Sequence, residues 1–90
     1  MRVAIIPAYQ AARTVGPLIK ELGAWFDEVW VLDDGSTDAT GEEAMRAGAR
    51  VLRHRQNQGK GAALQSLLEE AKTAGLDAVV SLDADGQHPA

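Results

Sequence analysis

Two spacings of apolar residues alternate along the chain, and together they predict strands separated by helices. Runs of consecutive apolar, often β-branched residues predict four short strands, over residues 2–6, 28–32, 50–54 and 78–82. Pro7 is expected to stop the first strand. Between the runs, apolar residues recur every three or four positions, which predicts three helices. This order favours right-handed crossovers and a three-layer α/β fold with a mostly parallel sheet of about four strands.

Capping residues mark the ends of the predicted helices. Thr14 is placed as the N-cap of the first helix and Gly23 as its C′ residue. Thr40 and Glu43 have the spacing of a capping box at the start of the second helix. The third and longest helix is predicted to bury one apolar face, formed by Leu64, Leu67, Leu68 and Ala71.

Polar clusters follow the carboxyl end of every predicted strand. They occupy residues 7–10, 33–38, 55–60 and 83–88, whereas the connections at the opposite edge are short and have no such clusters. In parallel sheets of this kind, ligands bind beyond the carboxyl ends of the strands, where the strand order reverses. The four clusters therefore predict a ligand site at one edge of the sheet.

The last cluster contains two carboxylates spaced by one residue. Asp83 and Asp85 would face the same way in an extended segment, while Ala84 turns aside. With the amide oxygen of Gln87 they offer oxygen ligands of the kind that Mg²⁺ or Mn²⁺ accepts. Because the motif is short, a polar loop that caps the strand is the competing interpretation.

Composition narrows the classes of function. Hydrophobic residues at 46% and charged residues at 24% are typical of one small globular domain. A net charge of −4 gives no basic surface for nucleic acid, and the absence of cysteine excludes disulfides and thiolate chemistry. The apolar N-terminal run is too short for a signal peptide or a membrane span. We therefore expect a soluble, cytoplasmic protein without a nucleic-acid partner.

Four ordered motifs are similar to the nucleotide-binding half of family 2 glycosyltransferases, above all dolichyl- or polyprenyl-phosphate mannosyl- and glucosyltransferases. They cover IIPAY at 5–9, VLDDGSTD at 31–38, NQGKGAA at 57–63 and DADGQHP at 83–89. The resemblance extends over residues 1–90. It implies the N-terminal half of a GT-A fold, an inverting sugar transfer from a UDP- or GDP-sugar to a polyprenyl phosphate, and Mg²⁺ or Mn²⁺ as cofactor.

The resemblance also implies roles for individual residues. The metal ligands would be Asp83, Asp85 and Gln87. The nucleotide would contact Pro7, Ala8, Tyr9, Val31, Asp33, Asp83, Ala84 and Asp85. Within this set, Asp33 would accept hydrogen bonds from the base or ribose, and Val31 with residues 7–9 would form the wall beside the base. Asp34 is interpreted as a turn and cap residue, Lys60 as a nucleotide contact or a solvated lysine, and His88 as support for the metal or an exposed residue.

Two features depart from the family pattern. Ala11 stands where the family often has glutamate, and the chain ends at Ala90, directly after the acidic motif. The acceptor pocket, the general base and any membrane-associated tail are therefore expected in a longer parent. The 90 residues alone are expected to bind the donor without catalysing transfer, and to self-associate through an unpaired sheet edge.

Other classes of function compete with this interpretation. A nucleotide-binding or self-assembling fragment without transferase activity stays open. A phosphatase of the haloacid-dehalogenase type carries its Asp-x-Asp after the first strand, whereas here it follows the last. An NAD-binding domain needs a glycine-rich turn where residues 7–10 have none. A P-loop needs serine or threonine at Gly61, and an EF-hand needs glycine at the sixth loop position.

Overall fold

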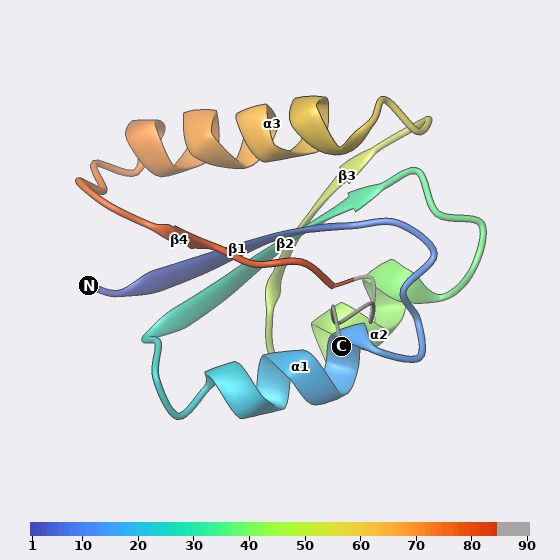
Figure 1. The fold of residues 1–90 in the computed structure, drawn as a ribbon, viewed down its shortest axis with the longest axis horizontal. Coiled ribbons are helices and arrows are strands. Elements are labelled where there is room, and N and C mark those ends of the chain that lie inside the picture. The colour runs from blue at the N-terminus through green and yellow to red at the C-terminus, as the bar shows by residue number, and fades with distance from the viewer. Residues whose placement is uncertain (85–90) are drawn as a thin grey trace, which may run out of the picture.

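The computed structural model describes residues 1–84 and shows a parallel four-stranded sheet with helices on both faces (Figure 1). The elements are, in order, β1 (Val3–Ala8), α1 (Val15–Leu22), β2 (Glu28–Asp34), α2 (Thr40–Arg46), β3 (Arg50–His54), α3 (Lys60–Thr73) and β4 (Val80–Ser81). The predicted three-layer α/β class is therefore confirmed.

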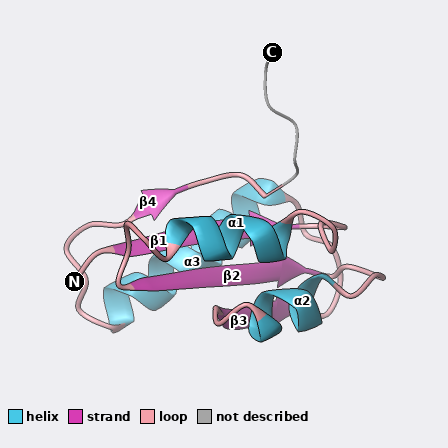
Figure 2. Cartoon of the chain, turned by 90° about the horizontal axis from the view of Figure 1, so that it is seen from below, coloured by secondary structure: helices cyan, strands magenta, loops and turns pink. Residues whose placement is uncertain are grey.

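The strand order β3-β2-β1-β4 reverses beside β1. The chain first moves outward from β1 through β2 to β3, and α3 then carries it back across the sheet to β4. Since crossovers between parallel strands are right-handed, the two directions of travel place their helices on opposite faces. Accordingly α1 and α2 cover one face and α3 covers the other (Figures 1 and 2). The reversal point lies between β1 and β4.

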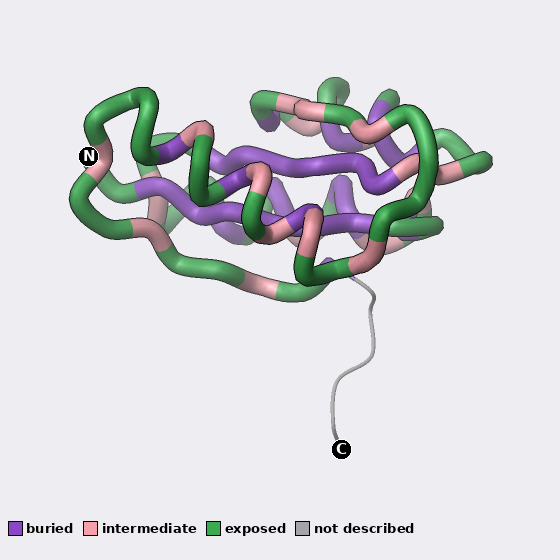
Figure 3. The backbone as a smooth tube through the Cα atoms, turned by 90° about the horizontal axis from the view of Figure 1, so that it is seen from above, coloured by how far each residue is buried: buried purple, intermediate pink, exposed green. Residues whose placement is uncertain are grey.

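Alternate residues of the central strands fill two cores, and β1 and most of β2 are buried along their length (Figure 3). The core under α3 contains Val3, Ile5, Trp30, Leu32, Ala63, Leu67 and Ala71. The core under α1 and α2 contains Ala4, Ile6, Val15, Ile19, Val29, Val31 and Ala44 among others. A sheet buried on both faces explains why its strands read as continuous apolar runs.

The strand β1 continues through Pro7, so the prediction that this proline stops it is wrong. The Ile5 carbonyl accepts a hydrogen bond from the Leu82 N–H at 3.0 Å, so the backbone groups of Ile5 face β4. Pro7, two residues further on, faces the same way, and its missing N–H leaves the register with Leu32 of β2 intact. The strand predicted over residues 78–82 is shorter in the structure, where β4 comprises Val80 and Ser81. At its carboxyl end, the missing N–H of Pro7 removes the donor that would continue the pairing of β1 with β4.

Three predicted helix features also differ. Gly23 has a φ of −59°, so it is no left-handed C′ residue. Thr40 is the first residue of α2 and its N-cap is Ala39, because the Thr40 hydroxyl bonds Asp38 and accepts the Ala11 N–H instead. Leu68 is 46% exposed, since the face of α3 that meets the sheet is centred on Leu67. No helix in residues 1–84 has the length and apolar character needed to cross a membrane.

Leu67 and Leu68 provide a matched test of this helix face. Leu67→Ala is expected to lower the free energy of unfolding by about 2–4 kcal/mol, because the side chain is fully buried and its loss leaves a cavity. Leu68→Ala removes the same atoms from an exposed position and should cost less than about 1 kcal/mol. Urea unfolding followed by tryptophan fluorescence measures both changes. Equal losses would contradict the orientation of α3.

Candidate functional site

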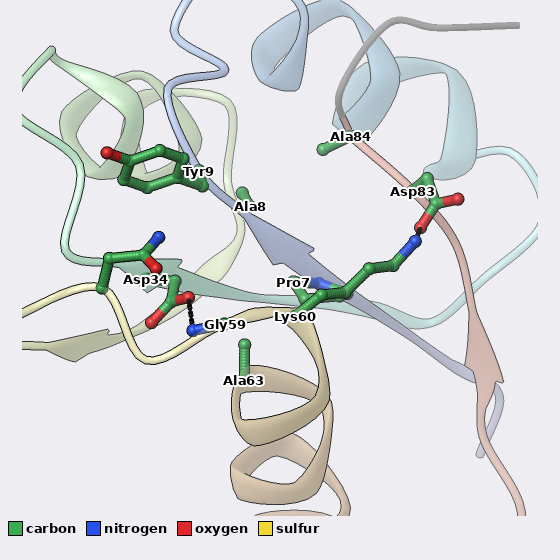
Figure 4. A pocket seen from close by; sticks show the side chains of 10 residues that line it. Pro7, Ala8, Tyr9, Asp34, Gly59, Lys60, Ala63, Asp83 and Ala84 are labelled. Atoms are coloured by element: carbon green, nitrogen blue, oxygen red, sulfur yellow. Dashed lines mark hydrogen bonds and ion pairs between the residues drawn. The ribbon is translucent and has the colours of Figure 1, made fainter.

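A pocket of about 400 Å³ opens at the carboxyl edge of the sheet, where the strand order reverses (Figure 4). Four segments form its walls: the end of β1, the end of β2, the start of α3 with its preceding loop, and the segment after β4. The lining residues are Pro7, Ala8, Tyr9, Asp34, Asn57, Gly59, Lys60, Ala63, Asp83 and Ala84. All four polar clusters singled out in the sequence thus contribute to one pocket.

The two consecutive aspartates of β2 face opposite sides of the sheet. Asp34 follows Trp30 and Leu32 at steps of two residues, which places it on the α3 face and in the pocket wall. Asp33 follows Val31, which is fully buried in the core under α1 and α2. Neither Val31 nor Asp33 is among the residues that line the pocket, although both are predicted nucleotide contacts. The alternation that separates the two aspartates is visible in the sequence.

The Asp33 carboxylate makes local contacts on the face of the sheet that α1 and α2 cover. Its Oδ1 accepts the Ser36 N–H at 3.0 Å, and its Oδ2 lies 3.9 Å from Arg53 Nε. The carboxyl group is only 4% exposed. Asp33 therefore shapes the turn after β2, while the carboxylate that reaches the pocket is that of Asp34.

The buried carboxylate of Asp34 holds the loop that forms one pocket wall. Its Oδ1 accepts the Gln58 N–H at 3.0 Å and lies 2.8 Å from His54 Nδ1, and its Oδ2 accepts the Gly59 N–H at 2.9 Å. Burial alone would raise the pKa of Asp34, but the hydrogen bonds from Gln58, His54 and Gly59 favour the charged form and lower this pKa below its ordinary value. Asp34 is thus a structural anchor as well as a wall residue.

Gly35 allows this loop to pass close to the end of β2. It has a φ of +74°, and a Cβ at this position would lie 2.4 Å from the Asn57 backbone nitrogen. Any other residue would force these two segments apart. Because Asn57 lines the pocket, the glycine helps to set the shape of this wall.

A second set of hydrogen bonds positions the wall at Tyr9. The next residue, Gln10, has a φ of +52°, which is uncommon for a residue other than glycine. Its Oε1 accepts the Thr37 N–H at 2.7 Å, and its own N–H donates to Ser36 Oγ at 2.9 Å. These bonds tie the loop after β1 to the loop after β2 and leave the Tyr9 ring about half exposed beside the pocket.

The Lys60 side chain extends to Asp83 at the pocket (Figure 4). The Lys60 ammonium forms an ion pair with Asp83 Oδ1, and both side chains are more than half exposed. Lys60 is also the first residue of α3, where backbone N–H groups lack partners within the helix and give it a positive end. The pocket is therefore bordered by the positive start of α3 and by an ion pair between Lys60 and Asp83.

Asp83 is the one predicted metal ligand that lies within residues 1–84. Asp85 and Gln87 lie outside the described residues, as does His88, and the described part of the chain contains no group of three or more acidic, histidine or cysteine ligands. The exposed Asp83 carboxylate borders the pocket and already attracts a cation, the Lys60 ammonium. This oxygen donor fits a hard divalent cation.

The lowered pKa of Asp34 makes stability depend on pH in a specific direction. The carboxylate contributes stability above its unfolded-state value near 3.8, and this contribution is lost as pH falls through the lower folded-state pKa. Asp34→Asn is therefore expected to cost about 1–3 kcal/mol at neutral pH, and to flatten the loss of stability in acid. Thermal unfolding between pH 2 and 7 measures this. Asp77→Asn, at an exposed position, is the control and should keep the parent profile.

Comparisons with known proteins agree on one family. Residues 3–90 match the sequence profile of glycosyl transferase family 2. Glycosyltransferase AglJ of Haloferax volcanii is 37% identical over 96% of this chain and 28% of its own length. The UDP-N-acetylglucosamine–dolichyl-phosphate N-acetylglucosaminyltransferase of Methanococcus voltae is 31% identical over 93% of this chain and 41% of its own length.

A solved structure has the same fold and contains ligands. Glucosyl-3-phosphoglycerate synthase of Mycobacterium tuberculosis, in complex with Mn²⁺, UDP-glucose and phosphoglyceric acid, matches with a TM-score of 0.75 and 31% identity, over 93% of this chain and 33% of that one. The present chain thus spans well under half the length of the proteins it matches. From the profile match, the fold and these relatives, the chain belongs to glycosyl transferase family 2.

Proposed function

We propose that the pocket binds the nucleotide-diphosphate part of a sugar donor, as the donor site of an inverting, metal-dependent glycosyltransferase. The observation that carries the proposal is that Lys60, at the start of α3, and Asp83 meet in one pocket. The helix start and the ammonium attract a diphosphate. The Asp83 carboxylate would hold Mg²⁺ or Mn²⁺, and this cation would supply the positive charge that lets a carboxylate and a diphosphate share the pocket.

Solved relatives support the choice of donor and metal. The synthase of M. tuberculosis has been solved with Mn²⁺ and UDP-glucose, and also with Mg²⁺ and UDP. We therefore favour a UDP-sugar over a GDP-sugar. Bound there, the cation would neutralise the charge that grows on the leaving diphosphate.

Different residues of this chain would bind the metal, the diphosphate and the base. Asp83 would hold the metal, together with Asp85 and Gln87 beyond the described part. Lys60 would contact the diphosphate oxygens, and the segment 7–9 would form the apolar wall beside the base. The Asp34 carboxylate offers about four acceptor positions, of which His54 and the Gln58 and Gly59 amides occupy three. The last position suits an N–H or O–H group of the nucleotide.

The acceptor we propose is a polyprenyl phosphate. The relative from M. voltae supports it, because that enzyme is named for transfer to dolichyl phosphate. A small phosphorylated acid is the second candidate, favoured by the phosphoglyceric acid in the M. tuberculosis complex. We also propose that the protein acts in the cytoplasm, with membrane association and the general base contributed by a longer parent.

Binding of the donor nucleotide is directly measurable on this chain. In calorimetry with Mn²⁺ present, UDP is expected to bind with a dissociation constant in the millimolar range or tighter. Lys60→Ala should weaken binding by about tenfold, because the substitution removes a positive charge from the pocket. Lys72→Ala, in the last turn of the same helix, is the matched control and should leave the affinity unchanged. If UDP and GDP both fail to bind at millimolar concentration with metal, the donor-site assignment is wrong.

Self-association through β4 stays a prediction. Within the described residues β4 pairs with β1 on one side only, and Val80 is 48% exposed. An open strand edge can pair with the edge of another copy. Light scattering at rising concentration is expected to give masses above the 9.6 kDa of the monomer. A constant monomer mass would rule the prediction out.

A further inference from the structure

Three side chains form a hydrogen-bonded chain from the pocket wall to the middle of α3. His54 Nδ1 lies 2.8 Å from Asp34 Oδ1, and His54 Nε2 lies 2.9 Å from Ser66 Oγ. Asp34 ends β2, His54 ends β3, and Ser66 belongs to α3. The carboxyl group is 3% exposed and the imidazole 13% exposed. In the donor site proposed above, His54 appears only as a hydrogen-bond partner of Asp34, and Ser66 has no part.

The order Asp–His–Ser is also that of serine hydrolases, in which histidine activates the hydroxyl as a nucleophile. Here it is Asp34 that lines the pocket. Ser66 lies in the second turn of α3, next in sequence to the fully buried Leu67. The hydroxyl therefore fits the role of an anchor, and the chain of bonds acts on the carboxylate at its other end.

The protonation pattern of this chain follows from its acceptors. The ionised Asp34 can only accept, so Nδ1 of His54 carries a proton whether the imidazole is neutral or charged. The Ser66 hydroxyl bonds the other ring nitrogen, Nε2, and the two bonds together fix the plane of the imidazole. With His54 and Gln58 on Oδ1 and Gly59 on Oδ2, the carboxylate cannot rotate without losing a hydrogen bond.

We propose that His54 is a positioning residue of the donor pocket. Its Nδ1–H holds the Asp34 carboxylate in the orientation that fixes the Gln58 and Gly59 amides, and thereby the start of α3 at Lys60. Gly59 and Lys60 both line the pocket, so a small rotation of Asp34 would shift the positive wall that faces the diphosphate. This inference rests on the proposed function for its effect on nucleotide affinity, but not for its effect on the loop.

Two substitutions separate the two ends of the imidazole. The amide nitrogen of asparagine is bonded to Cγ, as Nδ1 of histidine is, so His54→Asn keeps a donor for Asp34 and loses the contact with Ser66. The amide nitrogen of glutamine lies one bond further out, close to the Nε2 position. His54→Gln therefore keeps the contact with Ser66 and loses the donor for Asp34. Ser66→Ala removes only the outer bond and is the matched control.

The first measurement is hydrogen exchange of the Gln58 and Gly59 amides in the whole 90-residue chain, each rate divided by that of the core amide of Val31. The ratios are expected to stay within about threefold of the parent value in His54→Asn and Ser66→Ala, and to rise about tenfold in His54→Gln. A loss of global stability raises the Val31 rate as well, so a ratio that rises reports opening of the loop beyond any global change. Equal ratios in the Asn and Gln variants would overturn the proposal, because they would show a role in packing alone.

The second measurement is UDP affinity with Mn²⁺ in the same variants. The affinity of His54→Asn is expected to match that of the parent chain, and that of His54→Gln to be about tenfold weaker. A parent chain that binds neither UDP nor GDP would refute the proposed function, while the exchange ratios would still decide the role of His54. Parent-like UDP affinity in His54→Gln, with the exchange ratios raised, would overturn the link between Asp34 and the pocket.

Discussion

The reversal of strand order beside β1 is the constraint on which the site depends. The connections through α1 and α2 lead from β1 outward to β3, and α3 leads back across the sheet to β4. The helices that flank β1 and β4 therefore cover opposite faces, and no helix covers the gap between the carboxyl ends of these two strands. Pro7 then removes the amide that would continue their pairing, and the pocket lies where that pairing stops. The topology and one proline thus create the opening, and the polar residues only give it its chemistry.

The chemistry depends on a buried carboxylate, that of Asp34, which three hydrogen bonds hold in place. Taking the Asp34 carboxylate out of water is costly, and its hydrogen bonds to two amides and one imidazole offset that cost. The same bonds order the loop between β3 and α3, so that Lys60 starts its helix at the pocket. A wall that is ordered before a ligand arrives loses less entropy on binding. The Asp34 carboxylate therefore contributes both to the stability of the fold and to the order of the pocket wall.

Much of this arrangement could be predicted from the sequence, and the failures have identifiable causes. The strand at residues 50–54 and the gathering of four polar clusters at one edge follow from apolar runs and crossover topology, and both are observed. Asp34 rather than Asp33 lines the pocket because neighbouring strand residues face opposite sides of the sheet, and the contact of Asp33 with the base or ribose stays a prediction. The path of β1 through Pro7 depends on which neighbouring strand the proline faces, and the exposure of Leu68 depends on how α3 packs on the sheet. Both are decided by tertiary structure.

The location of the donor site is the central claim, and a nuclear magnetic resonance titration tests it most directly. Adding UDP and Mg²⁺ to the isotope-labelled chain should shift amides at the carboxyl edge, above all those of Ala8, Gly59, Lys60 and Ala84. A second pocket at the opposite edge, which includes Gly23 and Gly48, serves as the internal control and should not respond. Shifts centred on that second pocket, with the carboxyl edge unchanged, would contradict the account.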